Sequence, residues 1–355
     1  MFLHEYELIK AGSILVKELF KLKPGETFII TADTESDSRV VDATASAAFA
    51  IGAKPLVIWL ASPLGEGKAA DPMLPIKALT AVLKEADAWV EFNKYFLQSS
   101  TPYNIAMKEN KKLRFLGLDG MNAAMMKRCI GRVNYPVLRN FLEKITEMTR
   151  DAKHVRMTTD LGTDVEFKNA KTQDGKPNPN HPFSTNAGYA DTPGTHFLAG
   201  QIGWAPDFKS INGTIVFDGS LVEMCGILKD PVSLTIEEGE IIKVEGGRQA
   251  MEFEDWTKSF NHPQMFKIAH ATYGFHPGAM LTGIGVEDER IWGCTVWGMG
   301  AVDASFLNPG GISAPSHSDG ICLNTSVWLD GKQIMEKGKM VRPDLAKLAK
   351  ELGKS

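Results

Sequence analysis

The stretch from Phe28 to Leu60 reads FIITADTESDSRVVDATASAAFAIGAKPLVIWL. In it, an apolar run of strand length at Phe28–Thr31 is followed by a helix-like segment at Ser36–Ile51 and a second apolar run at Pro55–Leu60. Two buried strands joined by a helix are typical of a right-handed βαβ unit, whose strands belong to one parallel sheet. This stretch therefore predicts an α/β domain.

The same pattern continues to about residue 150. Apolar runs recur at Ala88–Phe92 and Arg114–Leu118, with helix-like segments between them. Strands spaced in this way predict a parallel sheet with helices on both faces. A helix expected at Leu138–Arg150 leads out of this domain, so we place the first domain at residues 1–152. The chain has no glycine-rich nucleotide or phosphate loop, so a nucleotide-binding role is not supported.

From His154 onward, hairpin signals replace helical spacing. Short apolar runs flank turn sequences, of which Asp330-Gly331 is the clearest. We therefore expect residues 153–355 to form a largely antiparallel β domain of the α+β kind, closed by a helix at Pro343–Leu352.

Composition is typical of a soluble globular protein, with 43% hydrophobic and 23% charged residues, and a length of 355 residues predicts two domains. The net charge of −4 gives no reason to expect nucleic acid as a partner. The first residues do not resemble a signal peptide, and no apolar run is long enough for a membrane span. Four scattered cysteines favour a reducing compartment. We therefore expect a cytoplasmic protein that does not associate with a membrane.

Histidine and carboxylate side chains gather in the C-terminal half. His317 and Asp319 lie two residues apart beside an apolar run, and residues two apart in a strand point to the same side. A His-x-Asp pair alone is a weak signal, because a surface histidine and a turn aspartate give the same pattern. His270, at the polar end of another apolar run, supplies a third donor. His276 is the alternative third ligand, but Pro277 follows it, which favours a turn.

Two imidazoles and one carboxylate are typical of the facial triad of non-haem Fe(II) oxygenases. Three protein ligands on one face of an octahedral ion leave the other positions to substrate oxygens and O₂. Cysteine is absent from the cluster, which disfavours structural zinc. The residues therefore predict one catalytic Fe(II) held by His270, His317 and Asp319, with O₂ as co-substrate.

Two further residues are predicted to be catalytic. His196 suits an acid/base role because a histidine side chain titrates near neutral pH, although a buried histidine with one structural hydrogen bond is an equally good interpretation. Arg290 could neutralise an anionic substrate oxygen, or it could form an ion pair with Glu287 or Glu289.

Aromatic residues near the same segments could wall a substrate pocket or belong to the core. We predict the pocket at Gln201, Trp204, Tyr273, His276 and Trp297.

Several segments of the C-terminal half resemble, in order, motifs of aminopeptidase T-like metallopeptidases. The resemblance implies an N-terminal α/β domain and a β-rich metal-binding domain. It covers the whole chain in outline and the C-terminal half in motifs. The matching segments are Gly200–Pro206, Asn212-Gly213, Gly274–Pro277, Gly298–Gly300 and His317–Asp319.

The chain departs from the peptidase pattern at three metal-binding positions. In this resemblance, Gln201 replaces a metal-bridging glutamate, His270 replaces a second glutamate, and Trp297 replaces a histidine. These losses should remove a two-metal centre, whereas His270 beside His317 and Asp319 leaves a one-metal triad. The pattern is similar to that of the 2,5-dihydroxypyridine 5,6-dioxygenase-like branch of the same superfamily.

That branch implies Fe(II), extradiol-type opening of a hydroxylated aromatic or N-heterocyclic small molecule, a role in aromatic catabolism, and a homo-oligomer. It also implies that His196 acts as an acid/base without binding the metal. Residues Tyr95–Thr101, which we expect to border the site, contain no histidine, so the ring that is cleaved stays open.

Two alternatives remain. One is an aminopeptidase T-like hydrolase with Zn, Co or Mn, which needs replacement ligands such as Asp218, Glu223 or Glu252. The other is a binding scaffold without metal.

Overall fold

The computed structural model describes residues 5–222 and 225–354, which divide into two compact units. The first unit comprises the described residues up to Val133 together with Asn186–Ala199, and the second comprises Asn134–Thr185 and the described residues from Gly200 onward. This division differs from the expected single boundary after residue 152. Residues 134–151 belong to the second unit, and the chain returns to the first unit at 186–199.

The first unit is built on a parallel sheet, as predicted. The four apolar runs predicted as strands all lie in it, but its edge strand at 194–197 was not predicted. In spatial order the strands are β2 (Lys54–Leu60), β1 (Thr27–Asp33), β3 (Ala88–Glu91), β4 (Arg114–Gly117) and β8 (Gly194–Phe197).

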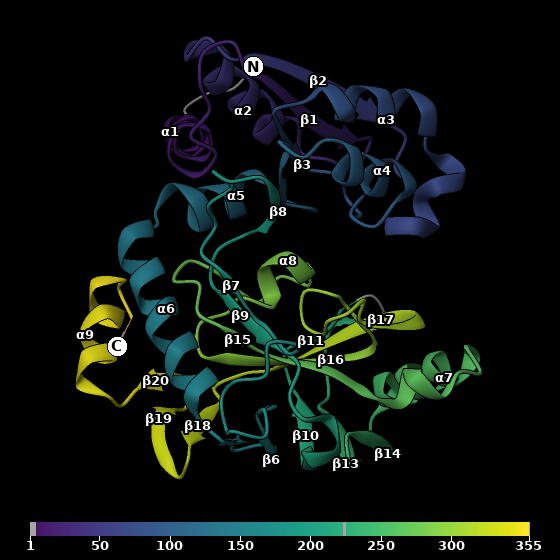
Figure 1. Ribbon diagram of the computed structural model, residues 1–355, viewed down its shortest axis with the longest axis vertical. Coiled ribbons are helices and arrows are strands. Elements are labelled where there is room, and N and C mark those ends of the chain that lie inside the picture. Colours follow the sequence, from purple (N-terminus) through teal and green to yellow (C-terminus); the bar gives the residue numbers. More distant parts are fainter. Residues whose placement is uncertain (1–4, 223–224, 355) are drawn as a thin grey trace. The chain divides into compact units, whose positions relative to one another are not determined.

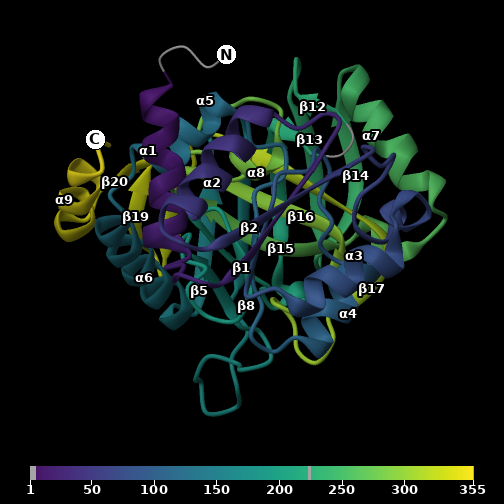
Figure 2. The same ribbon diagram turned by 90° about the horizontal axis from the view of Figure 1, so that it is seen from above.

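Helices cover both faces of this sheet, which confirms the predicted α/β architecture. They are α1 (Tyr6–Ile14), α2 (Ser38–Ala50), α3 (Ile76–Glu85), α4 (Thr101–Glu109) and α5 (Ala123–Met126). Ile29, Trp89 and Phe115 pack with apolar residues of α3 and α4, whereas the buried Phe28 and Val90 point to the opposite face. Helix α1 lies against α2, and α3 lies against α4 (Figure 2).

Carboxylates gather at the carboxyl ends of β3 and β4. Glu91, the last residue of β3, is 1% exposed, and its Oε2 accepts a hydrogen bond of 2.8 Å from the Leu97 amide. Burial, reinforced by repulsion from Asp119, raises the pKa of Glu91 well above its ordinary value. Burial and Asp119 also raise the pKa of Glu66 to about 7. Protonated carboxyl groups are therefore part of the folded state of this unit.

The second unit is largely antiparallel β structure, as predicted, and it contains two sheets. The turn at Asp330-Gly331 has φ angles of 48° and 77°, which a tight hairpin of this type requires. One sheet contains, in order, β14 (Glu240–Gly246), β13 (Val232–Glu237), β10 (Asn212–Phe217), β6 (Asp164–Lys168), β5 (His154–Thr158), β18 (Ser326–Leu329), β19 (Lys332–Glu336) and β20 (Lys339–Met340). The other contains β12 (Gly226–Ile227), β11 (Ser220–Leu221), β17 (Ile312–Cys322), β16 (Cys294–Val302), β15 (Ile268–Gly274), β9 (Gln201–Trp204) and β7 (Phe183–Asn186).

The two sheets pack face to face around an aromatic core. Phe167 of β6 makes an edge contact with Trp297 of β16, with 5.6 Å between ring centroids. Gly320 of β17 leaves room for the ring of Phe217 of β10, because a Cβ at residue 320 would lie 2.3 Å from that ring. Close packing of this kind fixes the sheet that carries β15, β16 and β17.

Helices cover the outside of these sheets. Helices α6 (Tyr135–Asp151) and α9 (Pro343–Glu351) lie side by side, while α7 (Arg248–Ser259) contacts β14 (Figure 1). The short helix α8 (Gly285–Asp288) follows β15. Helix α7 was not predicted, although its buried Ala250, Phe253 and Thr257 have helical spacing. No helix in the described part of the chain is long and apolar enough to cross a bilayer.

Replacing Glu66 by Gln should reduce the loss of stability as pH rises. An unfolded glutamate releases its proton near pH 4.5, whereas folded Glu66 keeps it to about pH 7. The folded state therefore binds more protons in this window, and the free energy of unfolding falls as pH rises. The glutamine variant should lose about 2 kcal/mol less between about pH 5 and pH 8. Urea titrations at both pH values measure this difference.

The control is Glu35→Gln, at an exposed position. An equal fall in stability for Glu66→Gln and the unaltered protein would contradict the burial of a protonated Glu66.

Candidate metal centre

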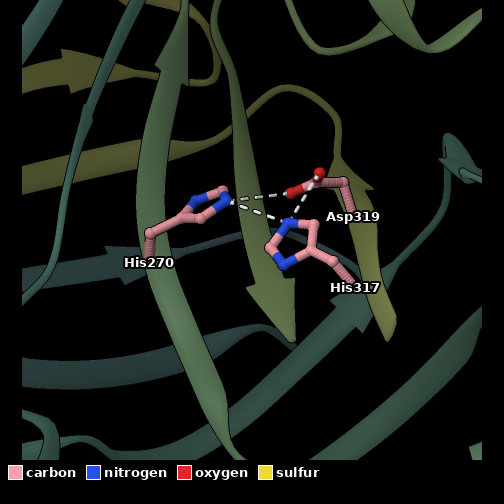
Figure 3. A group of neighbouring side chains, drawn as sticks. All are labelled: His270, His317 and Asp319. Carbon is pink, nitrogen blue, oxygen red and sulfur yellow. Dashed lines mark hydrogen bonds and ion pairs between the residues drawn. The ribbon is translucent and has the colours of Figure 1, made fainter. Parts of the chain in front are cut away.

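Three neighbouring antiparallel strands carry the candidate metal ligands. The register places His270 of β15 opposite Gly298 of β16, and Gly298 opposite Asp319 of β17. His317 lies two residues before Asp319 on the same strand and points to the same side. Figure 3 shows the His270 side chain extending from its strand toward His317 and Asp319, across the strand between them. The register thus joins segments that are 47 residues apart in the sequence.

The donor atoms of the three residues lie close together, and we call the two Nε2 atoms and the Asp319 carboxylate the donor triangle. Nε2 of His270 lies 3.2 Å from Nε2 of His317 and 3.3 Å from Oδ1 of Asp319. Nε2 of His317 lies 3.1 Å from Oδ2 of Asp319. Two ligands bound at about 2.1 Å and at right angles around one ion are about 3.0 Å apart. The spacing of the donor atoms therefore fits one face of an octahedral metal ion.

Hydrogen bonds to the outer ring nitrogens favour the tautomers that metal binding requires. Nδ1 of His317 lies 2.8 Å from the carbonyl oxygen of Ala301, which can only accept, so Nδ1 carries a proton. In the neutral ring, Nε2 then presents its lone pair. Nδ1 of His270 lies 3.1 Å from Oγ1 of Thr272, a hydroxyl that can accept in the same way. Two unprotonated Nε2 atoms at this distance repel each other unless a cation lies between them.

Asp319 adds a second feature that a cation would satisfy. Its side chain is buried, and its Oδ1 accepts no hydrogen bond from the residues that the structure describes. Buried polar atoms without a partner are uncommon, because burial removes the hydrogen bonds that water would make. A metal ion bound by His270, His317 and Asp319 would supply the missing interaction.

The surroundings of the triad also set its protonation states. Burial raises the pKa of Asp319, but the charges that His317 and His270 can carry more than offset this effect and lower the pKa to about 2. Burial lowers the pKa of His270 to about 4, although Asp319 opposes that shift. At neutral pH the carboxyl group is therefore ionised and the His270 imidazole is neutral, and these are the forms that bind metal.

Gly298 provides the space in which the His270 ring lies. A Cβ at residue 298 would lie 2.3 Å from Nε2 of His270 and 2.5 Å from its Cδ2. Real Cβ atoms do not approach other atoms so closely, so any larger residue would displace the ligand. The strand between the ligand-bearing strands must therefore carry glycine at this position.

Three of the predicted pocket residues lie on the opposite face of the sheet. Trp204 and Trp297 both pair with Ala271, the neighbour of His270, so strand alternation turns them away from the triad. They and Tyr273, which is also on that face, are fully buried. Their large side chains form part of the core between the sheets, so the structure does not bring them together with the triad. We leave all three out of the proposed pocket.

Gln201 lies on the triad face and links two charged residues. Its amide nitrogen donates to Oε2 of Glu289 at 2.9 Å, and its carbonyl oxygen accepts from Nη2 of Arg290 at 3.1 Å. Arg290 is buried and also lies 3.4 Å from Oε2 of Glu289, which is one of the two ion pairs considered from the sequence. Its positive charge nevertheless contributes to the low pKa of Asp319.

Two other predicted histidines do not belong to the triangle. His276 is fully buried in the turn after β15, where its Nδ1 accepts a hydrogen bond of 3.0 Å from the Gly278 amide. His196 lies in β8 of the first unit, and its Nε2 lies 2.8 Å from the carbonyl oxygen of Thr192. A catalytic role for His196 and a pocket role for His276 stay predictions.

The carboxylates considered for a second metal have other partners. Asp218 accepts a hydrogen bond of 2.7 Å from the Leu323 amide, and Glu252 pairs with Arg248 on α7 at 2.7 Å. Glu223 lies outside the described residues. Within residues 5–222 and 225–354, the triad is the one group of three or more His, Cys, Asp or Glu donors close enough to share an ion. The described residues therefore fit one metal ion.

Three residues that shape the site were not predicted for it. A glycine inside a strand indicates close approach of another group, so Gly298 carried a usable signal. Thr272 follows His270 by two residues and shares its face of the strand. Phe306 follows β16 in a loop, where no sequence pattern indicates a close neighbour. Its ring centroid lies 4.7 Å from that of His270.

Replacing Gly298 by Ala should prevent metal binding. The new methyl group would overlap the His270 ring, so the donor triangle opens. We expect the iron content after anaerobic reconstitution to fall at least about tenfold, as for other changes that misplace a ligand. Elemental analysis gives the iron content, and far-ultraviolet circular dichroism checks the fold.

Val296→Ala is the matched control, because Val296 is a buried apolar residue of the same strand that provides no donor. A folded Gly298→Ala protein with normal iron content would contradict the assigned role of Gly298.

Comparisons with known proteins agree with the resemblance predicted from the motifs. The family model described as "NicX: 2,5-dihydroxypyridine 5,6-dioxygenase" matches residues 15–342. A 2,5-dihydroxypyridine 5,6-dioxygenase from Pseudomonas putida is 30% identical over 176 residues, which are 46% of this chain and 50% of that protein. The chain thus aligns with about half the length of this curated relative.

Solved structures with the same fold cover nearly the whole chain. The 2,5-dihydroxypyridine dioxygenase from Pseudomonas putida KT2440 has a TM-score of 0.77 at 20% identity, covering 97% of this chain and 100% of that chain. Wild-type AmpT from Thermus thermophilus has a TM-score of 0.69 at 14% identity, covering 96% of this chain and 100% of that chain. At these identities the structures show a common fold. The family match, by contrast, covers most of the sequence, and the chain therefore belongs to the 2,5-dihydroxypyridine 5,6-dioxygenase (NicX) family.

Proposed function

We propose that the chain is a non-haem Fe(II)-dependent dioxygenase of the extradiol type, which opens a hydroxylated aromatic or N-heterocyclic ring such as a dihydroxypyridine. The observation that carries this proposal is the donor triangle of His270, His317 and Asp319. The two Nε2 atoms lie 3.2 Å apart, and each lies 3.1 to 3.3 Å from one oxygen of the Asp319 carboxylate. Two neutral imidazoles and one carboxylate are the ligand set of the Fe(II) facial triad. Membership of the dihydroxypyridine dioxygenase family supports the class of substrate.

When bound, Fe(II) supplies the redox chemistry through which O₂ and the substrate ring react with each other. The chain contributes three ligands from one side. Gly298 adds no side chain beside them, so the His270 ring can lie over the middle strand and reach the ion. Holding the reacting molecules in fixed positions lowers the entropic part of the activation barrier.

Arg290 and His196 are proposed to handle the proton of the substrate hydroxyl. Arg290 is held by Gln201 and Glu289, so it presents a fixed positive charge whose field reaches Asp319. Such a charge favours the ionised form of a nearby hydroxyl group. His196 is proposed as the base that accepts the released proton.

The direct test is anaerobic reconstitution with Fe(II), followed by measurement of O₂ uptake with a panel of hydroxylated pyridines and catechols. We expect about one iron per chain and O₂ consumption with at least one ring. About two metal ions per chain together with peptide hydrolysis would instead establish an aminopeptidase-like hydrolase. No bound ion, and no rise in melting temperature when Fe(II) or Zn(II) is added, would favour a metal-free scaffold.

Replacing His270 by Ala should remove iron and activity together, because the ion loses one of its three protein ligands. His276→Ala is the matched control and should retain iron, since His276 lies outside the donor triangle. Elemental analysis and an oxygen electrode measure both properties. Normal iron and a normal rate in His270→Ala would remove the triad assignment.

Replacing His196 by Ala should leave the iron content unchanged and lower the rate of turnover about a hundredfold, which is typical for loss of a general base. Iron content and the pH dependence of O₂ uptake measure this effect. An unchanged rate at every pH would show that another group accepts the proton.

A further inference from the structure

An aromatic side chain from the β16–β17 loop lies on the triad face. The loop comprises residues 303–311 and joins the strand that carries Gly298 to the strand that carries His317 and Asp319. Its Phe306 ring lies beside the His270 ring, with 4.7 Å between centroids and 41° between planes. The loop thus folds back so that Phe306 contacts the ligand on β15.

A glycine on β9 allows Phe306 to lie directly on the sheet. Gly203 pairs with Thr272, so it belongs to the same face as His270. A Cβ at residue 203 would lie 2.8 Å from Cε1 of Phe306 and 3.0 Å from its Cζ. The ring therefore rests where the sheet has no side chain of its own.

Hydrogen bonds within the β16–β17 loop hold the backbone at Phe306 in place. The amides of Phe306 and Leu307 both donate to the carbonyl oxygen of Asp303, at 3.0 and 3.2 Å. The Ser305 amide donates to Oδ1 of Asp303 at 2.7 Å, and the Gly311 amide donates to the carbonyl oxygen of Leu307 at 2.8 Å. These bonds hold the loop in a defined turn, so the ring is oriented before any ligand binds.

Phe306 differs in position from the three large aromatic residues predicted to wall the pocket. Trp204, Tyr273 and Trp297 are fully buried on the opposite face, whereas Phe306 is partly exposed on the triad face. Part of its ring surface is therefore still available for contact beside the donor triangle. An apolar aromatic surface next to metal ligands suits a planar aromatic molecule that binds the metal through its hydroxyl oxygens.

We propose that Phe306 is a substrate-binding residue that packs its ring against the ring of the aromatic substrate. This inference rests on the proposed function, because it places a hydroxylated ring at the triad. Offset or edge contacts between rings favour aromatic over non-aromatic ligands of similar charge. Phe306 thus selects aromatic molecules, while the metal selects their oxygen donors.

The test compares Phe306→Leu with the unaltered protein, both loaded with Fe(II) under argon. Leucine keeps an apolar side chain but removes the aromatic ring. Calorimetric titration with 2,5-dihydroxypyridine should show about tenfold weaker binding by the variant. Titration with oxalate, a non-aromatic oxygen chelator, should give equal affinities. Iron content should be unchanged.

Two further variants sharpen the comparison. Leu307→Ala is the matched control, because it alters the next side chain but keeps the backbone bonds of the loop. It should bind both compounds as the unaltered protein does. Gly203→Ala should weaken dihydroxypyridine binding in the same direction as Phe306→Leu, because its methyl group displaces the Phe306 ring.

Each outcome bears on one proposal. Equal dihydroxypyridine affinity in Phe306→Leu and in the unaltered protein would overturn the role of Phe306 and leave the proposed function intact. Loss of iron, or weaker oxalate binding, would show that Phe306 supports His270 and does not contact substrate. If the unaltered, iron-loaded protein binds neither dihydroxypyridine nor any catechol, the proposed function itself fails.

Discussion

The metal centre depends on the missing side chain at Gly298. Neighbouring strands lie about 4.8 Å apart, so β15 and β17 are separated by about 10 Å, with β16 between them. Side chains from the outer strands can share one ion only by meeting above the middle strand. His270 does so by lying over Gly298, where a Cβ would be 2.3 Å from its Nε2. The site therefore requires both this register and a glycine at this position.

The surroundings lower the pKa of both His270 and Asp319, and both net shifts favour metal binding. Burial keeps His270 neutral, whereas Asp319 stays ionised because the neighbouring imidazoles outweigh the cost of burying its charge. In the form that binds metal, the buried carboxylate lies next to two unprotonated nitrogens, and together they produce a strongly negative electrostatic potential. Such a site is costly when empty, so a bound cation contributes to the stability of the fold as well as to chemistry.

The parallel sheet was predictable because strands buried on both faces appear in the sequence as continuous apolar runs. The hairpins were predictable because turn sequences such as Asp330-Gly331 specify a tight turn. Strand β8 was not predictable, since Thr195 and His196 make it polar. It joins the first unit through pairing with β4 and a hydrogen bond between Thr195 and Tyr103 of α4. Tyr273 is three residues from His270, so alternation already placed it on the other face. For Trp204 and Trp297 the register with Ala271 was needed. The position of Phe306 depends on how a loop folds back, which no local pattern encodes.

The environment of Gln201 supports the proposal of one metal ion instead of two. Its amide donates from its nitrogen to Glu289 and accepts at its oxygen from Arg290, so a neutral group bridges a carboxylate and a guanidinium that also pair directly at 3.4 Å. A glutamate at this position would place a second carboxylate within about 3 Å of Glu289, and the repulsion would need another cation to offset it. Glutamine removes that need. Within the described residues, the donors close enough to share one ion are those of His270, His317 and Asp319, and Arg290 adds a positive charge beside Gln201.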